Sequence, residues 1–467
     1  MALDKIEVDY VVIGAGAMGM AFADIILTES DKTVLIVDMH QKPGGHWNDA
    51  YPFVTLHQPS AYYGVSSKEL SKGVIDSIGL NKGLQDLASG PEIMAYFDEV
   101  MRYQFLPTGR VTYLPMCKYE DGGKVTALTS DKTYQVTARE KIVDATWLRT
   151  TVPSTHTPNF EIADGVNMIP LNDLPKVTEQ PSRYVIIGGG KTGIDAVIWL
   201  LENHVDPEQI HWVRPRDAWL MRRENTQPAG QYFEATMGAQ AAQMEAIAQS
   251  DSVSDLFDRL EAAGVFTRID PAFRPTMFHG ATISDPELAE LKKVKNVIRM
   301  GRIQRIEPEQ IIFDEGPLES DPNTLFVDCS ACAVGNSEVV PVFAGETIRL
   351  QTVRTVQPVF SAAFIAHIEL TRDTEEEKNR LCQVVPLPNH DTDWIGMQSA
   401  FMMNQYTWSQ EKDLREWLLN NRLDGYSQLA ASVGEGEEGK IAILKRVREN
   451  AVPSVMKLQE YAAELAS

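Results

Sequence analysis

The stretch YVVIGAGAMG, residues 10–19, decides the fold. Apolar residues that favour a β-strand run into glycines at positions 14, 16 and 19, and an alanine- and methionine-rich stretch typical of a helix follows. A dinucleotide-binding βαβ unit has this order, because glycines allow the tight turn and let the backbone approach a pyrophosphate at the helix start. Gly14, Gly16 and Gly19 therefore predict a Rossmann-like unit near the N-terminus.

The pattern returns in YVIIGGGKTG, residues 184–193. Gly188, Gly190 and Gly193 repeat the three glycines, and Lys191 and Thr192 lie inside the second turn. The spacing GxxxxGK of a phosphate-binding loop is absent, so Lys191 is not a phosphate-loop lysine of that kind. Two Rossmann-like units in one α/β protein, each with a nucleotide site, are predicted.

The two units differ where their second strands end. In the first unit TVLIVD ends at Asp38, whose carboxylate can accept hydrogen bonds from a ribose diol and would repel a 2′-phosphate. In the second unit IHWVRP offers Arg214, with Arg216 close behind, and guanidinium groups bind phosphate. We therefore expect NADPH at the second site and FAD at the first, since two sites for one nicotinamide cofactor would serve no obvious hydride chemistry.

The order of elements predicts one domain that is interrupted by another. KIVDATW and TLFVDCSACAVG are both apolar strands that end in aspartate and small residues, which suits an outward and an inward crossing. We expect the first part of the FAD domain at residues 1–150 and the NADPH domain at 178–332, with a helical insertion at about 230–265. Residues 333–467 would return to the FAD domain and form a helical C-terminal region whose role, over 370–467, stays open.

Composition excludes several classes of partner. The formal charge of −22 argues against nucleic acid or insertion into an anionic membrane, because both partners need a positive face. The chain has no run of about 18 apolar residues that could span a bilayer, and its N-terminus lacks a signal-like apolar stretch. Four cysteines in 467 residues do not make a secreted disulfide framework, so a cytoplasmic location is expected.

With these motifs the sequence resembles the flavoproteins that have two dinucleotide-binding domains, and within them the flavin-containing and Baeyer–Villiger monooxygenases. KPGGHWNDAYPFVTLHQPS, residues 42–60, is similar to the GGxW segment of that family, and VRPRDAWLMRR is similar to its NADPH segment. The resemblance implies that Gly45, Trp47, His57 and Ser60 lie near the flavin. The family's linker motif FxGxxxH keeps only Gly165.

Several side chains in these segments are candidates for chemistry or cofactor binding, each with a structural alternative. His46 and His57 could donate to the flavin or relay a proton, or could satisfy loop backbone. Trp47 could pack on the flavin or fill the core. Glu346, in FAGETI, could take the place of a ribityl-binding acid in related flavoproteins, or belong to an ordinary loop. His57 and Trp47 are our catalytic candidates.

Cys329 and Cys332 form the one CxxC pair. No second pair of cysteines or histidines completes four ligands, so no metal is predicted. A redox pair is expected shortly after the first unit in disulfide reductases of this architecture, and no cysteine lies there. We interpret the two thiols as buried structural cysteines.

These features favour an FAD-containing, NADPH-dependent monooxygenase that acts on a small organic molecule with O₂ through a flavin C4a peroxide. Two alternatives remain: an FAD-dependent NADPH oxidoreductase without oxygen transfer, and a redox regulator that binds FAD and NADPH without turnover. The substrate and the oligomeric state, including a homodimer, stay open.

Overall fold

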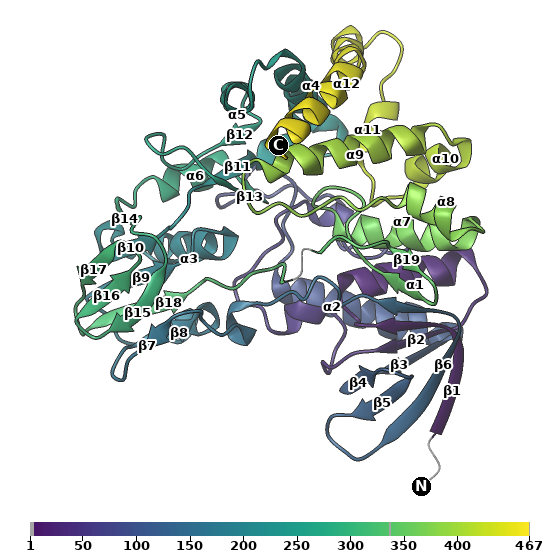
Figure 1. Ribbon diagram of the computed structural model, residues 1–467, viewed down its shortest axis with the longest axis horizontal. Coiled ribbons are helices and arrows are strands. Elements are labelled where there is room, and N and C mark those ends of the chain that lie inside the picture. The colour runs from purple at the N-terminus through teal and green to yellow at the C-terminus, as the bar shows by residue number, and fades with distance from the viewer. Residues whose placement is uncertain (1–3, 336–337, 467) are drawn as a thin grey trace.

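The computed structural model describes residues 4–335 and 338–466. At the lower right of Figure 1 lies a sheet with strand order β19-β20-β6-β1-β2-β3, next to which β4 and β5 form an antiparallel extension. Ile13 pairs with Val37 on one side and with Asp144 on the other, so β1, β2 and β6 end at one edge. The strands are β1 (Asp4–Ile13), β2 (Val34–Val37), β3 (Val111–Leu114), β4 (Cys117–Glu120), β5 (Lys124–Ala127), β6 (Thr133–Asp144), β19 (Phe343–Ala344) and β20 (Thr347–Arg349).

Two helices from distant parts of the chain cover one face of this sheet. α1 (Ala17–Glu29) follows β1, and α7 (Pro358–Thr371) packs beside it in the same apolar core. All four residues of β2 are buried, as expected of a parallel strand covered on both faces. The segment after residue 342 therefore completes the unit that residues 4–144 begin.

The second Rossmann-like unit is a five-stranded parallel sheet at the left of Figure 1, with order β14-β10-β9-β18-β8. Its strands are β8 (Met168–Pro170), β9 (Arg183–Ile187), β10 (Ile210–Val213), β14 (Asn296–Ile298) and β18 (Thr324–Asp328). The helices α3 (Lys191–Glu202) and α6 (Asp285–Leu291) pack on it. A small sheet beside it contains β7 (Glu161–Ile162), β15 (Ile303–Glu307), β16 (Gln310–Phe313) and β17 (Gly316–Glu319).

The two crossings between the units lie side by side. The Gly335 N–H donates to the Leu148 carbonyl (2.9 Å), and the Thr151 N–H donates to the Cys332 carbonyl (3.3 Å). This confirms the predicted class, two Rossmann-like units of which the first is interrupted by the second. The degenerate linker motif lies in β7, β8 and the turn between them, where Gly165 has a φ of +85°. β8 precedes residue 178, so the second sheet begins earlier in the chain than the predicted domain.

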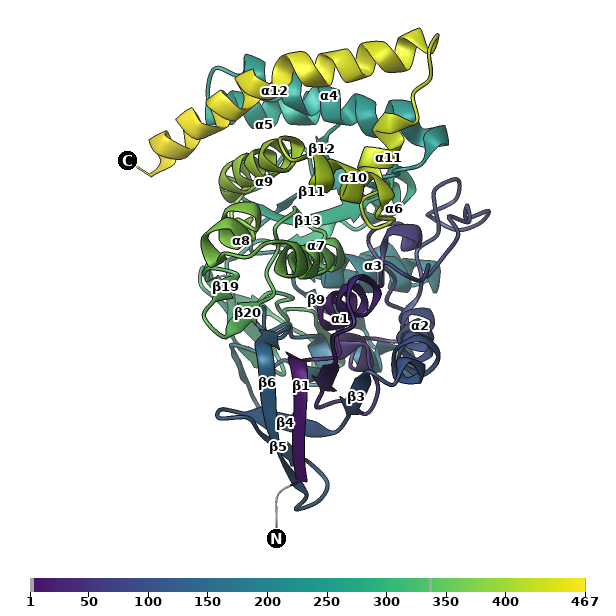
Figure 2. The ribbon, with the colours of Figure 1, turned by 90° about the vertical axis from the view of Figure 1, so that its right-hand side faces the viewer.

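A helical layer covers the top of the molecule (Figure 2). α12 (Glu438–Leu465) runs along α4 (Phe233–Gln249), where Ser454 Oγ donates to the Met244 carbonyl (2.8 Å). α5 (Val253–Ala262) and α9 (Asp393–Ser409) share their apolar core with the sheet of β11 (Ala218–Arg222), β12 (Phe266–Thr267) and β13 (Met277–Ile283). The remaining helices are α2 (Gly90–Val100), α8 (Glu375–Leu381), α10 (Lys412–Asn420) and α11 (Tyr426–Ala431). Within the described ranges, no helix combines the length and the apolar character that a bilayer crossing requires.

Candidate nucleotide-binding and active site

The first glycine turn joins β1 to α1 at the carboxyl edge of the first sheet. Gly14 has a φ of +102°, which favours glycine, and its N–H donates to the Val37 carbonyl (2.8 Å). A Cβ on Gly19 would lie 2.0 Å from the Gly14 carbonyl oxygen, so the helix passes directly against the turn. Gly16 is the N-cap of α1, and no side chain caps this helix. The first N–H groups of α1 are therefore available to an anion such as a pyrophosphate.

The segment Gly44–Asn48 closes one side of this turn. The Gly44 N–H donates to the Ala15 carbonyl (2.8 Å), and a Cβ on Gly45 would lie 2.8 Å from the Gly16 Cα. Gly44 and Gly45 both have positive φ angles, +127° and +56°. The predicted residue Gly45 thus lies against the first turn, and the close backbone approach requires glycine there.

Asp38 lies beside the turn, but its carboxylate is already engaged. Oδ2 accepts from the Ala15 N–H (2.5 Å), while Oδ1 accepts from the His40 N–H (2.7 Å) and lies 2.8 Å from His40 Nδ1. The side chain is 5% exposed. A carboxylate oxygen can accept a further hydrogen bond, so ribose binding by Asp38 stays a prediction. The contacts of the structure show Asp38 holding the backbone of the turn.

His40 joins Asp38 to Asp49, a contact that the sequence analysis did not predict. Its Nε2 lies 2.8 Å from Asp49 Oδ2. The hydrogen bond to Asp38 and then that to Asp49 outweigh burial and raise the pKa of His40 to about 9. The imidazole is therefore protonated at neutral pH and holds two carboxylates at the edge of the first site.

We expect the free energy of unfolding to fall as the pH rises from 6.5 to 9. The folded pKa of His40 lies above its ordinary value of 6.5, so its contribution is complete below pH 6.5 and is lost as the pH passes through about 9. With the imidazole 31% exposed, the contribution is roughly 1–2 kcal/mol. Denaturant unfolding of wild type and His40→Gln across this pH range measures it. Identical pH slopes in the two proteins would contradict the assignment.

The GHWN turn after Gly44 places Trp47 between the two units. Its Nε1 donates to Tyr63 Oη (2.9 Å), and its ring packs against the apolar cores of both units. The neighbouring ring of His46 lies 5.0 Å away, and burial lowers the pKa of His46 to about 4, so this imidazole is neutral. These positions agree with a role for Trp47 and His46 where the units meet, and that role stays a prediction.

The Ser60 hydroxyl is engaged by backbone groups. Its hydroxyl donates to the Asp86 carbonyl (2.9 Å) and accepts from the Ala88 N–H (2.6 Å), and the residue is fully buried. Both roles of the hydroxyl are used to hold the loop before α2. The position of Ser60 near the flavin, which the family resemblance implies, stays a prediction.

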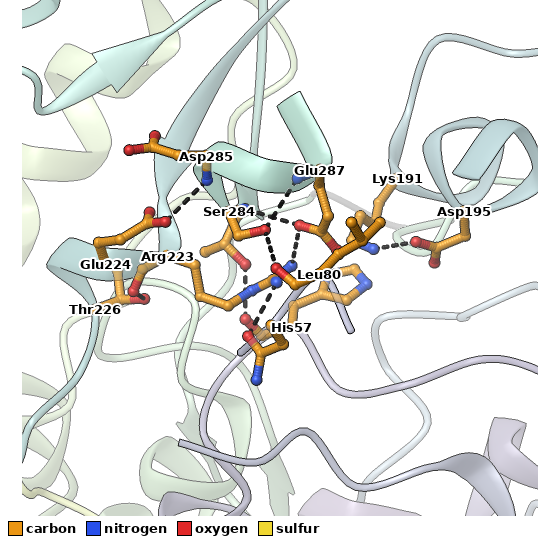
Figure 3. A network of polar contacts seen from close by, with 12 residues as sticks. His57, Leu80, Lys191, Asp195, Arg223, Glu224, Thr226, Ser284, Asp285 and Glu287 are labelled. Carbon is orange, nitrogen blue, oxygen red and sulfur yellow. Dashed lines mark hydrogen bonds and ion pairs between the residues drawn. The ribbon is translucent and has the colours of Figure 1, made fainter. Parts of the chain in front are cut away.

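His57 belongs to a polar network at the start of α6, close to Lys191 of α3 (Figure 3). Its carbonyl accepts from Thr282 Oγ1 (2.6 Å), and its ring lies near Lys191 and Arg223. Burial, and then these two cations, lower the pKa of His57 well below its ordinary value. A neutral imidazole can donate or accept one hydrogen bond from each nitrogen, but it cannot act as an imidazolium acid at neutral pH.

Lys191 and its neighbours link the second helix to the first unit. Lys191 Nζ forms an ion pair with Asp195 one turn along α3, and Tyr51 Oη donates to Asp195 Oδ2 (2.6 Å). Tyr51 lies in the segment that follows Gly45 and Trp47. Tyr51 and Asp195 were not predicted as site residues, because nothing in the sequence relates an AYP segment to a helix in the second unit.

The second glycine turn repeats the geometry of the first. Gly188 has a φ of +131°, and its carbonyl accepts from Trp212 Nε1 (2.8 Å). A Cβ on Gly193 would lie 2.1 Å from the Gly188 carbonyl oxygen, whereas one on Gly190 would meet nothing within 4 Å. Gly190 is the N-cap of α3, and no side chain caps this helix. The uncapped N–H groups at Gly190 and half-buried Thr192 leave the helix start open to an anion, and pyrophosphate binding there stays a prediction.

The two predicted phosphate-binding arginines differ in accessibility. The Arg214 side chain is 3% exposed and stacks on Trp212 at 4.6 Å, and its Nη2 lies 3.0 Å from Asp217 Oδ1. Burial lowers the pKa of Arg214 to about 10. Arg216 is half-buried, and its Nη2 donates to Asn389 Oδ1 (2.9 Å). An amide does not neutralise a guanidinium, and among the described residues Arg216 forms no ion pair, although the charge of Asp393 acts on it; Arg216 is therefore better placed than Arg214 for a 2′-phosphate.

Arg302 adds a second accessible cation to this region. Burial and then the charge of Arg302 lower the pKa of Arg216, which places the two guanidinium groups near each other. Arg302 is exposed, and its side chain forms no ion pair within residues 4–335 and 338–466. Arg302 lies far from Arg216 in the sequence, which is why the motif analysis missed it.

Glu346 and the CxxC pair are corrected by the structure. Glu346 is exposed on the turn between β19 and β20, at the amino end of β20, whereas the glycine turn lies at the carboxyl edge beyond Arg349. The structure therefore does not bring Glu346 to the first site. Cys329 is buried, and burial raises its thiol pKa well above the ordinary value. Cys332 is exposed and its Sγ donates to the Val334 carbonyl (2.9 Å), so the interpretation as a buried pair is wrong for Cys332.

Comparison with known proteins gives a family and a fold class. A family model described as an NAD(P)-binding Rossmann-like domain matches residues 12–65, which include the first glycine turn. The uncharacterized proteins Rv2000 of Mycobacterium tuberculosis and Mb2023 of Mycobacterium bovis are each 46% identical to this chain over 419 residues. The match covers 90% of this chain and 78% of each relative.

Solved structures of flavin monooxygenases match the structure at low identity. They include a flavin monooxygenase mutant from Stenotrophomonas maltophilia (16% identity, 80% of this chain, 100% of that chain, TM-score 0.45). OTEMO in complex with FAD and NADP matches at 15% identity over 78% of this chain and 84% of that chain, with a TM-score of 0.47. ε-Caprolactone-bound cyclohexanone monooxygenase matches at 16% identity over 80% of this chain and 87% of that chain, also with a TM-score of 0.47.

Proposed function

The chain belongs to the protein family of Mycobacterium tuberculosis Rv2000, and we propose that it is an FAD-containing, NADPH-dependent monooxygenase that oxidises a small organic molecule with O₂. The observation that carries the proposal is that one segment, residues 44–57, contacts both the first glycine turn and the helix that follows the second. Gly45 lies against the first turn, and Tyr51 is hydrogen-bonded to Asp195 on the helix that follows the second. Two dinucleotides on these turns would extend toward the same segment, which is what hydride transfer between them requires.

In this proposal each turn holds one cofactor. The uncapped start of α1 would bind the pyrophosphate of FAD, and the uncapped start of α3 that of NADPH. Bound FAD would accept a hydride from NADPH and provide the means to activate O₂. Trp47, between the two cores, would exclude water from the junction, and neutral His57 would hydrogen-bond there without adding charge.

The proposed domains follow from these roles. The FAD domain would comprise residues 1–150 and the returning part of 333–467, and the NADPH domain residues 178–332 with the strand β8 that precedes it. The cytoplasmic location expected from the cysteine content is part of the proposal.

Three measurements on purified protein test the proposal against its two alternatives. Flavin absorbance in the protein as purified tests for FAD, and anaerobic bleaching by NADPH tests for hydride transfer. Incorporation of ¹⁸O from ¹⁸O₂ into an organic product separates a monooxygenase from an oxidoreductase that transfers only hydride. If the protein contains flavin that NADPH does not bleach, only the redox regulator without turnover agrees with the result. Protein that binds neither cofactor would contradict all three functions.

The Cys329→Ser/Cys332→Ser double variant is expected to keep flavin reduction by NADPH within about twofold of wild type. The buried thiol of Cys329 has a raised pKa and the exposed Cys332 donates to backbone, so neither is an activated thiolate. Stopped-flow reduction under anaerobic conditions measures the rate. A folded variant that keeps its FAD but is not reduced by NADPH would instead support a reductase that depends on these thiols.

A further inference from the structure

A cavity of about 190 Å³ lies between the helical layer and the turn that leads into α7. Its walls come from α4, α9, β11, β13 and residues 354–357. It is larger than the roughly 150 Å³ cavity that holds benzene in an engineered protein core, so it has room for a substituted ring. Neither glycine turn contributes to it.

The wall combines apolar side chains with polar ones, among them a set of amides that lack hydrogen-bond partners. The apolar lining includes Met221, Met244, Phe278, Trp394, Met397 and Phe401. Five glutamines also line the cavity, and their side chains accept or donate no hydrogen bond within the described residues: Gln240, Gln243, Gln357, Gln398 and Gln405.

Two of these glutamines have amide groups removed from solvent: Gln398 is a buried residue, and Gln357 is half-buried with a buried Oε1. Gln398 is only 6% exposed, and the buried Oε1 of Gln357 has no hydrogen-bond partner. A buried amide without a partner costs about 1–3 kcal/mol, which a bound group that completes its hydrogen bonds would recover. A cavity with apolar side chains and amides without hydrogen-bond partners is suited to a molecule with an apolar body and an oxygen that accepts hydrogen bonds.

The charges of the wall are compensated. Arg354 is the buried cation of the lining, and its Nη1 lies 3.1 Å from Asp424 Oδ1. Arg222 is bidentate to Asp285. Burial raises the pKa of Tyr426 to about 12, so its phenol is neutral. Among the described residues that line the cavity there is no aspartate or glutamate, so a cationic ligand would lose its hydration without gaining a counter-ion.

The cavity adjoins the first unit through residues 354–357. These residues follow β20, which ends at the same sheet edge as β1, and they precede α7, which packs beside α1. Val356, in the cavity wall, has a φ of +45°, an unfavourable conformation for a β-branched residue. A Cβ on Gly280 would lie 2.5 Å from Val356 Cγ1, so β13 passes directly against this turn. The turn therefore connects the cavity wall to the helix that packs beside α1.

We propose that this cavity is the substrate chamber and that its wall selects an uncharged, mainly apolar molecule with a carbonyl or similar oxygen, against an ammonium of the same shape. That the ligand is a substrate rests on the proposed function. The preference for an uncharged ligand depends only on the residues that line the cavity. Gln398 and Gln357 would hydrogen-bond the oxygen, and the methionines and aromatic rings would enclose the apolar body.

Calorimetric titration of the purified, flavin-loaded protein in the absence of NADPH tests the selection with three compounds of one skeleton. Acetophenone carries the carbonyl, 1-phenylethylamine is an ammonium at neutral pH, and ethylbenzene has neither group. We expect acetophenone to bind about tenfold more tightly than ethylbenzene and more tightly still than the amine.

The Gln398→Met variant should lower the affinity for acetophenone about tenfold and leave that for ethylbenzene unchanged. Gln410→Met, at the exposed end of α9, is the matched control and should change neither. An amine that binds as tightly as acetophenone, or a Gln398→Met variant with unchanged affinities, would overturn the selection. Failure of all three compounds to bind would overturn the chamber. Normal selection in a protein that NADPH does not reduce would contradict the proposed function alone.

Discussion

The Gly16→Ala variant is expected to fold and to lose most of its FAD, whereas Gly190→Ala is expected to keep FAD and to lose NADPH. Both glycines are helix N-caps with φ angles that alanine adopts, −71° and −84°. A Cβ on Gly16 would lie 3.5 Å from the Gly45 Cα, an ordinary contact, and one on Gly190 would meet no protein atom within 4 Å. In each variant the methyl group would obstruct mainly the approach of a pyrophosphate.

We expect each substitution to lower the affinity for the cofactor of its own site by about 10- to 100-fold, the effect of losing one or two charge-assisted hydrogen bonds. Flavin content after gel filtration and the concentration dependence of flavin reduction by NADPH measure the two effects, and each variant is the control for the other. Gly14→Ala is a poorer test, because alanine at a φ of +102° would strain the fold itself. Equal flavin content in wild type and a folded Gly16→Ala variant would contradict the first site.

The sequence predicts the two units because their signals are local. The strand, the glycines and the helix of each unit lie within about 30 residues, and the glycines are needed for reasons visible in the backbone, such as the contact of Gly19 with the Gly14 carbonyl. The interruption was also predictable, since β6 and β18 each end in an aspartate at a crossing. The place of Gly45 near the first site, by contrast, was implied only by the resemblance of its segment to the family's GGxW motif.

The errors and omissions concern residues whose partners lie far away in the sequence. Ser60 stays a predicted neighbour of the flavin, but the sequence did not show that its hydroxyl is engaged by backbone at Asp86 and Ala88. Glu346 was assigned from its motif without knowledge of strand direction, which puts it at the wrong end of β20. Arg302 reaches Arg216 only through the folded second unit. A motif fixes which residue type is present, whereas the tertiary contacts decide whether its side chain is free.

Arg214 shows the same distinction within one motif. As the first residue after β10 it takes the place in the second unit that Asp38 has in the first, which makes it the obvious partner of a 2′-phosphate. In the structure the Arg214 guanidinium stacks on the Trp212 ring and forms an ion pair with Asp217, which also forms an ion pair with Arg299 (2.8 Å). Its charge is therefore compensated before any cofactor arrives, and we assign the discrimination between NADPH and NADH to Arg216.

The Arg216→Ala variant is expected to raise the apparent KM for NADPH about tenfold and to leave that for NADH nearly unchanged. Only NADPH carries the 2′-phosphate, and one charge-assisted bond from a half-buried guanidinium contributes about 1.5 kcal/mol. The preference of wild type for NADPH should shrink as salt is added, because Arg216 and Arg302 are accessible to ions.

Arg214→Ala is the matched comparison, and its effect is expected on stability instead. Removing one partner of a buried ion pair leaves Asp217 with Arg299 alone and should lower the free energy of unfolding by about 2–4 kcal/mol. Initial rates with each nucleotide, together with denaturant unfolding of both variants, separate the two roles. If Arg214→Ala unfolds like wild type and loses affinity for NADPH alone, the phosphate binds at Arg214 and the buried ion pair must open to admit it.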